Sequence, residues 1–342
     1  MNSLEKAVSA QKNPFQKFLK KFYADNKKVI NTLFMIALVF IGGELFLTMF
    51  MDFSSGAFLS TRRIFLTVRL SAFIALFGLS QMVVISVGGG GLDLSVGWTA
   101  TLAAVLSSRV MDGQDSNLLL AVLVCILIGA AVGFLNGLLI AYAGLPPLVV
   151  TMAMASIVQG INNAYVSTYF IRGTAAPALR WIVSRFTGIF PNVVSIVLVA
   201  VVIMHIIINY TQIGVRMLGV GSNDITAYLS GVNVRVVRCC AYVASGIIAA
   251  LVGMVLVGSA GQAFMDMGSM YVLPSVVAVV IGGMSIAGGE GNYLAVVLGA
   301  VLLQTLTNLF VALGWGDAGK WVGYGVILLV MLIIYVRNKR SR

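Results

Sequence analysis

Residues 118–141 read LLLAVLVCILIGAAVGFLNGLLIA and contain no Asp, Glu, Lys or Arg. Such a stretch is long enough to cross a bilayer as a helix, because a helix rises about 1.5 Å per residue and the hydrocarbon layer is about 30 Å thick. Gly129 and Gly133 lie one turn apart in it, and Gly246 and Gly253 lie in a later apolar run. In lipid, small residues at this spacing are typical of helix faces that other backbones approach closely.

The rest of the chain repeats this apolar pattern. Of its 342 residues, 60% are hydrophobic and 10% charged, and the mean hydropathy is +1.02. A soluble domain has roughly 25% charged residues, so we expect an all-α integral membrane protein with about ten transmembrane helices. The candidate spans are 29–50, 64–87, 92–110, 118–141, 147–168, 192–210, 239–260, 273–288, 293–313 and 321–336.

The formal charge of +11 does not indicate nucleic acid, because the basic residues stand in blocks at the two ends and in one central loop. Membrane lipid, not nucleic acid, is the expected surrounding. Three cysteines, Cys125, Cys239 and Cys240, have neither metal-ligand spacing nor a disulfide framework.

The distribution of Lys and Arg predicts the orientation. They concentrate in the N-terminal arm, 1–28, and in the tail, 337–342, with the membrane domain, 29–336, between them. Cytoplasmic segments retain basic residues, so both termini are predicted to be cytoplasmic. An even number of spans agrees, and it places the central loop, about 211–238, on the same side.

One basic loop does not fit this topology. Arg172, Arg180 and Arg185 fall on the predicted outer side, and the sequence gives no account of them. A helix around 178–186, with Trp181 and Phe186 in the headgroup region, is one interpretation.

Two glycine-rich breaks separate apolar runs: 88–97 reads GGGGLDLSVG and 282–292 reads GGMSIAGGEGN. Glycines permit a non-helical backbone, and Asp93 or Ser95 can cap the helix that follows. Asp93 is therefore either a plain N-cap at a cytoplasmic turn or a carboxylate at membrane depth that faces a cavity or a partner. Paired interruptions are typical of transporters, in which unwound backbone lines the path.

Polar side chains within the apolar runs are the candidates for a solute path. Amides and hydroxyls without clustered charges suit a neutral, polyhydroxylated solute. For any single residue the alternative is an interhelical hydrogen bond. The candidates are Asp93, Ser95, Asn136, Gln159, Asn162, Asn163, Gln304 and Asn308.

No residue pattern points to catalysis, a cofactor or a resident metal ion. His205 is the sole histidine, which excludes a histidine-based triad or a histidine-rich metal site. Residues 314–321, GWGDAGKW, fit G-x-x-x-x-G-K, but Trp321 stands where a nucleotide-binding loop needs Ser or Thr. We therefore expect a transport protein without an ATPase of its own.

The central loop contains a short amphipathic segment bounded by glycines, which predicts a helix. A helix exposed on the cytoplasmic side is a candidate docking element, and the alternative is an ordinary surface helix. Its residues are Asp224, Ile225, Thr226, Ala227, Tyr228, Leu229, Ser230 and Gly231.

Several separated blocks carry a resemblance to a known family. They are GLDLSVG at 91–97, NG at 136–137 with LPPLVVT at 145–151, LSGV at 229–232, and VIGGMSIAGGEG at 280–291. From about residue 78 onward, the chain resembles the permease subunits of bacterial ABC importers for simple sugars, a family that includes ribose, xylose, galactose and autoinducer-2 permeases.

The resemblance implies a permease in the bacterial cytoplasmic (inner) membrane that works with a second permease, two cytoplasmic ATP-binding subunits and an external solute-binding protein. It also implies that 224–231 is the coupling helix. There the chain departs from the family pattern: Ile225 and Thr226 stand where an acidic residue and paired alanines are usual, and only Ala227 is kept. The resemblance therefore does not imply a particular ATPase partner.

The mechanism expected of such a protein is alternating access, in which ATP-driven closure of the ATPase dimer reaches the spans through the coupling helices. The alternatives left open are an ABC permease for a branched-chain amino acid, a nucleoside or an autoinducer-2-like solute, and a secondary carrier or channel. A membrane-embedded enzyme lacks any convincing cluster of nucleophile, base and metal ligands.

Overall fold

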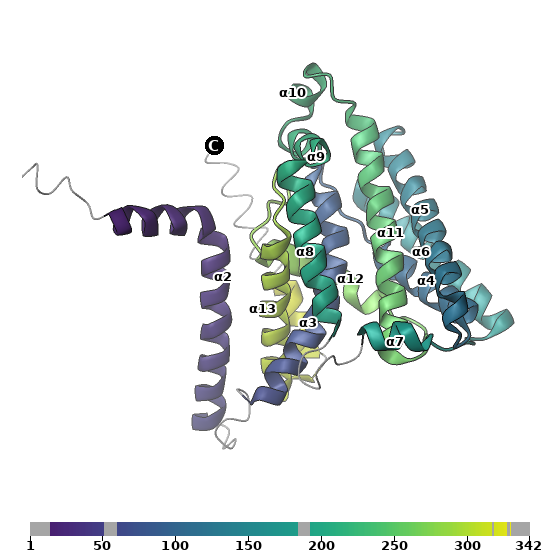
Figure 1. Cartoon of the computed structure of the whole chain (residues 1–342), viewed down its shortest axis with the longest axis horizontal. Helices are drawn as coiled ribbons and strands as arrows, with labels where there is room; N and C mark the ends of the chain where they lie inside the picture. Colours follow the sequence, from purple (N-terminus) through teal and green to yellow (C-terminus); the bar gives the residue numbers. More distant parts are fainter. Residues whose placement is uncertain (1–13, 51–59, 184–191, 317, 327–328, 330–342) are drawn as a thin grey trace, which may run out of the picture.

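The structure is a computed structural model of an all-helical chain. It describes residues 14–50, 60–183, 192–316, 318–326 and 329 (Figure 1). Residues 1–13 of the predicted basic arm and the predicted tail, 337–342, lie outside this part. The helices are α2 Pro14–Phe50, α3 Thr61–Ser86, α4 Val96–Met111, α5 Leu118–Ala141, α6 Pro147–Tyr169, α7 Pro177–Val183, α8 Asn192–Tyr210, α9 Gln212–Ser222, α10 Asp224–Leu229, α11 Val234–Ala260, α12 Val272–Ile281 and α13 Tyr293–Ala312, with single 3-10 turns at Asp115–Asn117 and Ser269–Tyr271.

The helices coincide with the predicted apolar runs, but several ends differ. Helix α12 ends at Ile281, before Gly282, whereas the predicted span continued to residue 288. Helix α4 begins at Val96 because the backbone before it is held in a non-helical form by the glycines. The predicted central loop, 211–238, is itself mostly helical, since it contains α9, α10 and the start of α11.

Six helices of the described part are long and apolar enough to cross a membrane: Val29–Met49 within α2, Thr61–Ser86, Asp115–Ala141, Asn192–Tyr210, Val234–Ala260 and Tyr293–Ala312. Residues Ser269–Ile281 form a shorter apolar helix. An all-α membrane protein is therefore confirmed, and the count of about ten spans stays a prediction.

Helix α11 lies at the centre of the bundle and packs against α5, α4 and α3. A methyl group on Gly129 or Gly133 of α5 would meet the carbonyl oxygens of Gly246 and Tyr242 on α11. Gly253 approaches the carbonyl of Ala100 on α4 in the same way. The predicted small-residue faces are confirmed as contact faces, and they hold α11 close to both neighbours.

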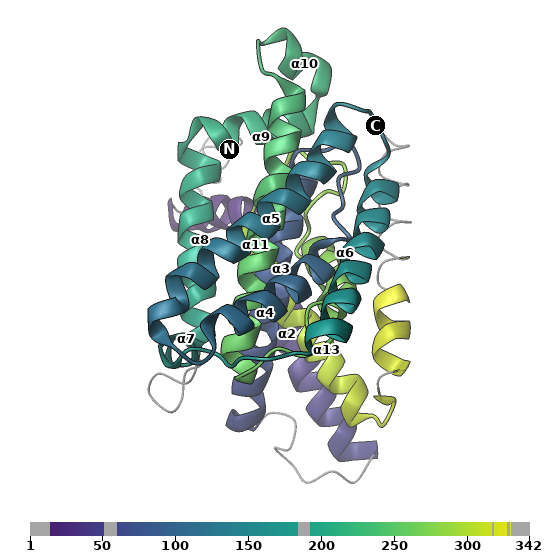
Figure 2. The ribbon, with the colours of Figure 1, turned by 90° about the vertical axis from the view of Figure 1, so that its right-hand side faces the viewer.

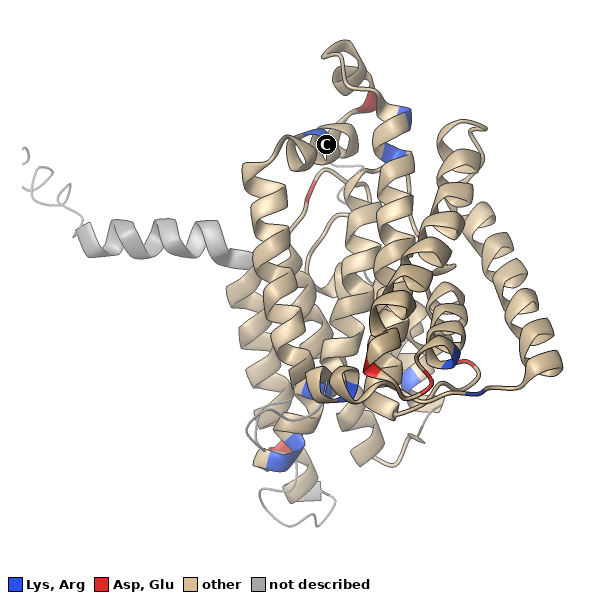
Figure 3. Cartoon of the chain, turned by 45° about the vertical axis from the view of Figure 1, so that its right-hand side comes forward, with Lys and Arg blue, Asp and Glu red and all other residues tan. Residues whose placement is uncertain are grey.

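Helices α10 and α7 lie at opposite ends of the bundle, as the predicted topology requires, and α10 projects beyond the other helices (Figures 1 and 2). Charged side chains gather at these two ends, while the middle of the bundle is nearly free of them (Figure 3). In α7, Leu179 and Val183 are buried and Trp181 is exposed, so the expected helix is present as far as Val183, where the described residues stop. Arg185 and Phe186 lie outside the described residues.

Helix α2 stands at the edge of the molecule (Figure 1), and its main neighbour is α13. Most of its apolar stretch, Val29–Met49, is not covered by protein, since 17% of it is buried. Such a surface is suited to contact with lipid.

Candidate functional site

The first glycine-rich break joins α3 to α4. Gly88, Gly89 and Gly90 have φ angles of +70°, +68° and +69°. Residues with a Cβ rarely adopt this left-handed conformation, so three such positions in succession require glycine. The break ends at Ser95, the N-cap residue of α4, whose side chain makes no capping hydrogen bond.

Asp93 lies in this break and is completely buried. Its Oδ1 accepts hydrogen bonds from the Ser95 amide at 3.0 Å and the Ser95 hydroxyl at 2.6 Å, and its Oδ2 accepts from Ser245 of α11 at 2.8 Å. The Gln81 side chain of α3 pairs with the backbone of Asp93. Its Nε2 donates to the Asp93 carbonyl at 2.7 Å, and its Oε1 accepts from the Asp93 amide at 3.2 Å. Hydrogen bonds to a carboxylate are stronger than neutral ones, so this residue anchors the break.

Two further contacts extend this network. Asn136 of α5 donates to the Ser95 hydroxyl at 2.9 Å, and Ser80 of α3 lies 2.8 Å from the Ser245 hydroxyl. Asp93, Ser95 and Asn136, three of the predicted path residues, are therefore brought together. Of the two interpretations of Asp93 from the sequence, the carboxylate that faces a partner agrees with the structure, because Asp93 is buried and bonded to Ser95 and to Ser245 of α11.

The two glycine-rich breaks meet each other and the end of α9. The Gly289 amide donates to the carbonyl of Ser86 at 3.1 Å. A methyl group on Gly88 would lie 2.9 Å from the carbonyl oxygen of Gly221, and one on Gly288 would lie 2.5 Å from the Cα of Gly88. The break segments and the residues just before α10 are thus in direct backbone contact.

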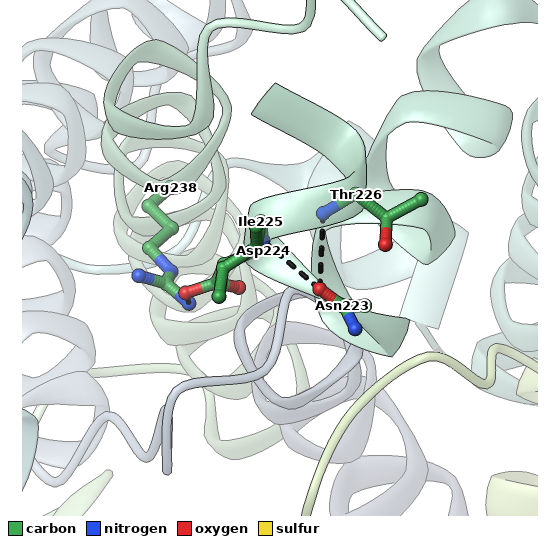
Figure 4. A network of polar contacts seen from close by, with 5 residues as sticks. All are labelled: Asn223, Asp224, Ile225, Thr226 and Arg238. Carbon is green, nitrogen blue, oxygen red and sulfur yellow. Dashed lines mark hydrogen bonds and ion pairs between the residues drawn. The ribbon is translucent and has the colours of Figure 1, made fainter. Parts of the chain in front are cut away.

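Helix α10 is held by its first residues. The Asn223 side chain accepts hydrogen bonds from the amides of Ile225 and Thr226, both at 3.0 Å, and Asp224 forms an ion pair with Arg238 of α11 at 2.6 Å (Figure 4). Ala227 is buried. The ion pair is partly exposed, so it contributes only about 0–1 kcal/mol to stability.

The free face of α10 is apolar. Ile225, Tyr228 and Leu229 are 72%, 71% and 78% exposed. They line a hollow of about 1080 Å³ between α10 and the start of α11. Large apolar side chains this exposed at the end of a helix bundle are typical of a surface that another protein covers.

Gln304 and Asn308, two further predicted path residues, lie apart from the Asp93 network. Gln304 donates to Asn308 at 2.9 Å, and Asn308 donates to Thr67 of α3 at 2.7 Å. Asn308 thus forms an interhelical hydrogen bond, which the sequence left open as the alternative to a place in the solute path. Thr67 and Gln81 are about 20 Å apart along α3. On α6, Gln159 is half-buried and Asn163 is exposed.

Asn162 differs from its neighbours on α6. It is fully buried, and neither its Nδ2 nor its Oδ1 has a hydrogen-bond partner. The Oδ1 of Asn136 is likewise buried and has no hydrogen-bond partner. Buried amide groups without partners are rare, so both residues retain capacity to bind a polar group.

Sequence reasoning missed Gln81 and Ser245 as parts of the site. Each is a polar residue inside an apolar run, the same signal that selected Asn136. Arg238 is one of the basic residues of the predicted central loop, and its pairing with Asp224 could not be predicted because it depends on where α10 lies relative to α11.

The family described as branched-chain amino acid transport system / permease component matches residues 63–335. The chain is 27% identical over 330 residues to the ribose import permease protein of Escherichia coli K12, covering 95% of this chain and 97% of that protein. It is 28% identical over 303 residues to the galactose/methyl galactoside import permease protein of the same strain, covering 78% of this chain and 90% of the relative.

A third relative is the fructose import permease protein of Rhizobium meliloti, with 29% identity over 286 residues, which covers 82% of this chain and 79% of that protein. No solved structure matches the chain at a comparable level of significance. The similarity extends along nearly the whole chain, including the Asp93 network and α10.

Proposed function

Since the chain belongs to the family of branched-chain amino acid transport system permease components, we propose that it is the membrane-spanning permease subunit of an ABC importer for a monosaccharide. The observation that carries the sugar assignment is the match to the ribose import permease, which spans 95% of this chain. Relatives named for galactose and fructose import support it. A sugar also agrees with the polar residues of the interior, which are mostly amides and hydroxyls.

We propose that α10, with Ser230 and Gly231 after it, is the coupling helix. Its exposed Ile225, Tyr228 and Leu229 form an apolar face that fits a groove on an ATP-binding subunit. Two such subunits, a second permease and an external solute-binding protein complete the proposed complex. The projection of α10 beyond the bundle (Figure 2) supports this role.

We place the α10 end, with both termini, on the cytoplasmic side of a bacterial inner membrane, and α7 on the outer side. The membrane domain is 29–336, flanked by basic cytoplasmic segments. Asn136 and Asn162 are the proposed solute contacts, because their buried amide atoms lack partners within the chain. Asp93 and Ser95 hold the break that lies beside Asn136.

The proposal is tested by sugar uptake. A deletion strain of the source bacterium is complemented with the gene, and uptake of radiolabelled ribose, galactose and fructose is compared with that of leucine. We expect gene-dependent uptake of a sugar that stops when cellular ATP is depleted. Uptake of leucine alone, or uptake that persists on an ion gradient without ATP, would contradict the assignment.

The coupling role is tested by Ala227→Pro. Proline removes an amide donor and clashes with the preceding turn, so it disrupts α10. We expect uptake to be abolished while the protein stays in the membrane, as measured by immunoblotting of washed membranes. Normal uptake by this variant would exclude α10 as the coupling helix.

A further inference from the structure

One side chain touches both α10 and the first glycine-rich break. The Nη2 of Arg238 donates to Asp224 of α10 at 2.6 Å. The same guanidinium group lies over Gly89: a methyl group there would be 2.9 Å from Nη2 and 3.1 Å from Cζ. A displacement of Asp224 therefore acts on the group that rests against the break.

Helix α11 holds the other end of the same break. Ser245 donates to Asp93 at 2.8 Å, two turns beyond Arg238 and about 10 Å along the helix. Arg238 at Gly89 and Ser245 at Asp93 thus attach the break to α11 at two points. Both points lie on one helix, which is packed tightly against α5 and α4.

The surroundings of Arg238 give it room to move. A hollow of about 240 Å³ lies beside it, lined also by Gly88, Gly89 and Tyr242. The Nε of Arg238 and the hydroxyl of Tyr242 are both buried without a hydrogen-bond partner. Buried donors without partners are costly, which favours a second arrangement in which they are bonded.

We propose that Arg238 is a positioning residue that transmits movement of α10 to the glycine-rich break at 88–95. It does so through its ion pair with Asp224 and its contact with Gly89. The inference rests on the proposed function, since it assumes that α10 is moved by an ATP-binding subunit. It adds the residue through which that movement enters the membrane domain.

The test measures the coupling of transport to ATP hydrolysis, not transport alone. It uses the complete complex, purified through a tag on this chain together with the ATPase that co-purifies. The variants are Arg238→Gln, Arg238→Lys and Asp224→Asn, and the control is Arg216→Gln. Arg216 is an exposed arginine of α9 whose contact is Gln212 on the same helix. Uptake of the sugar that the wild type transports is divided by the ATP hydrolysed.

We expect Arg238→Gln and Asp224→Asn to lower uptake per ATP by roughly 2- to 30-fold while the ATPase still co-purifies and hydrolyses ATP. Arg238→Lys keeps the positive charge but loses the planar group over Gly89, so it should lower the ratio as well. The control should match the wild type. The ion pair is partly exposed, so the variants should still reach the membrane.

Three results would overturn the inference. An unchanged ratio in Arg238→Gln would remove the residue from the transmission path, and a wild-type ratio in Arg238→Lys would remove the Gly89 contact. Loss of the co-purifying ATPase would make Arg238 a docking residue instead. Absence of any sugar uptake by the wild type is a separate result, which refutes the proposed function before a variant is compared.

Discussion

The two glycine-rich breaks look alike in sequence but are built differently. Asp93 of the first break is completely buried and bonded to Ser95 and Ser245, whereas Glu290 of the second is exposed. In the second break, Asn292 caps α13 by accepting from the Ala295 amide at 3.2 Å. A buried break needs a partner for each polar group, because neither lipid nor protein core supplies water. The first break is therefore an anchor inside the bundle, and the second is a connection that reaches its surface.

The largest difference between the breaks should appear on removing the two carboxylates. Asp93→Ala leaves the hydroxyls of Ser95 and Ser245 buried without their acceptor, and we expect a loss of about 4 kcal/mol in stability. Glu290→Ala should change stability by no more than about 0.5 kcal/mol. Thermal unfolding in detergent measures both. Equal melting temperatures for the two variants would remove the distinction between anchor and connection.

A second pair of variants separates the stability lost through a steric collision from the stability lost through backbone strain. Gly288 has a φ of +93° and faces Gly88, whereas Gly90 has a φ of +69° and open space around it. Gly90→Ala should cost about 1–2 kcal/mol from strain alone. Gly288→Ala adds a collision and should cost about 3 kcal/mol. If the two variants unfold at the same temperature, the contact between the breaks does not contribute.

The smallest effect should come from single hydroxyls. Ser245→Ala removes one of the hydrogen bonds to Asp93 and should cost about 1–2 kcal/mol. Ser285→Ala in the second break removes a local bond that the Ala287 amide donates to the Ser285 hydroxyl at 3.2 Å, near the surface, and should cost less than about 0.5 kcal/mol. Combining Ser245→Ala with Asp93→Ala should add little, since both act on one network. Full additivity in unfolding midpoints would contradict that network.

The helices could be predicted from the sequence because lipid requires long apolar runs, and such runs are visible without any tertiary information. The glycines at 129, 133, 246 and 253 likewise predicted contact faces that the structure confirms. Helix ends were less well predicted. In the case of α12, the glycines that end it at Ile281 were placed inside the span.

The partners of the site residues could not be predicted from one sequence. Ser245 is far from Asp93 in the chain and meets it only because α11 packs beside the first break. The Asp224 and Arg238 pair likewise depends on how α10 folds back over α11. Polar residues in spans can be listed from the sequence, but packing decides whether each is bonded, as Asn308 is, or left without partners, as Asn162 is.

The position of α2 has a consequence for how the chain is made. Its main neighbour is α13, which begins at Tyr293, roughly 240 residues after Phe50, the last described residue of α2. At about 5–20 residues per second, a ribosome needs roughly 12–50 s to synthesise that stretch. During this interval α2 must remain in the bilayer without α13, held by its own apolar surface and by lipid.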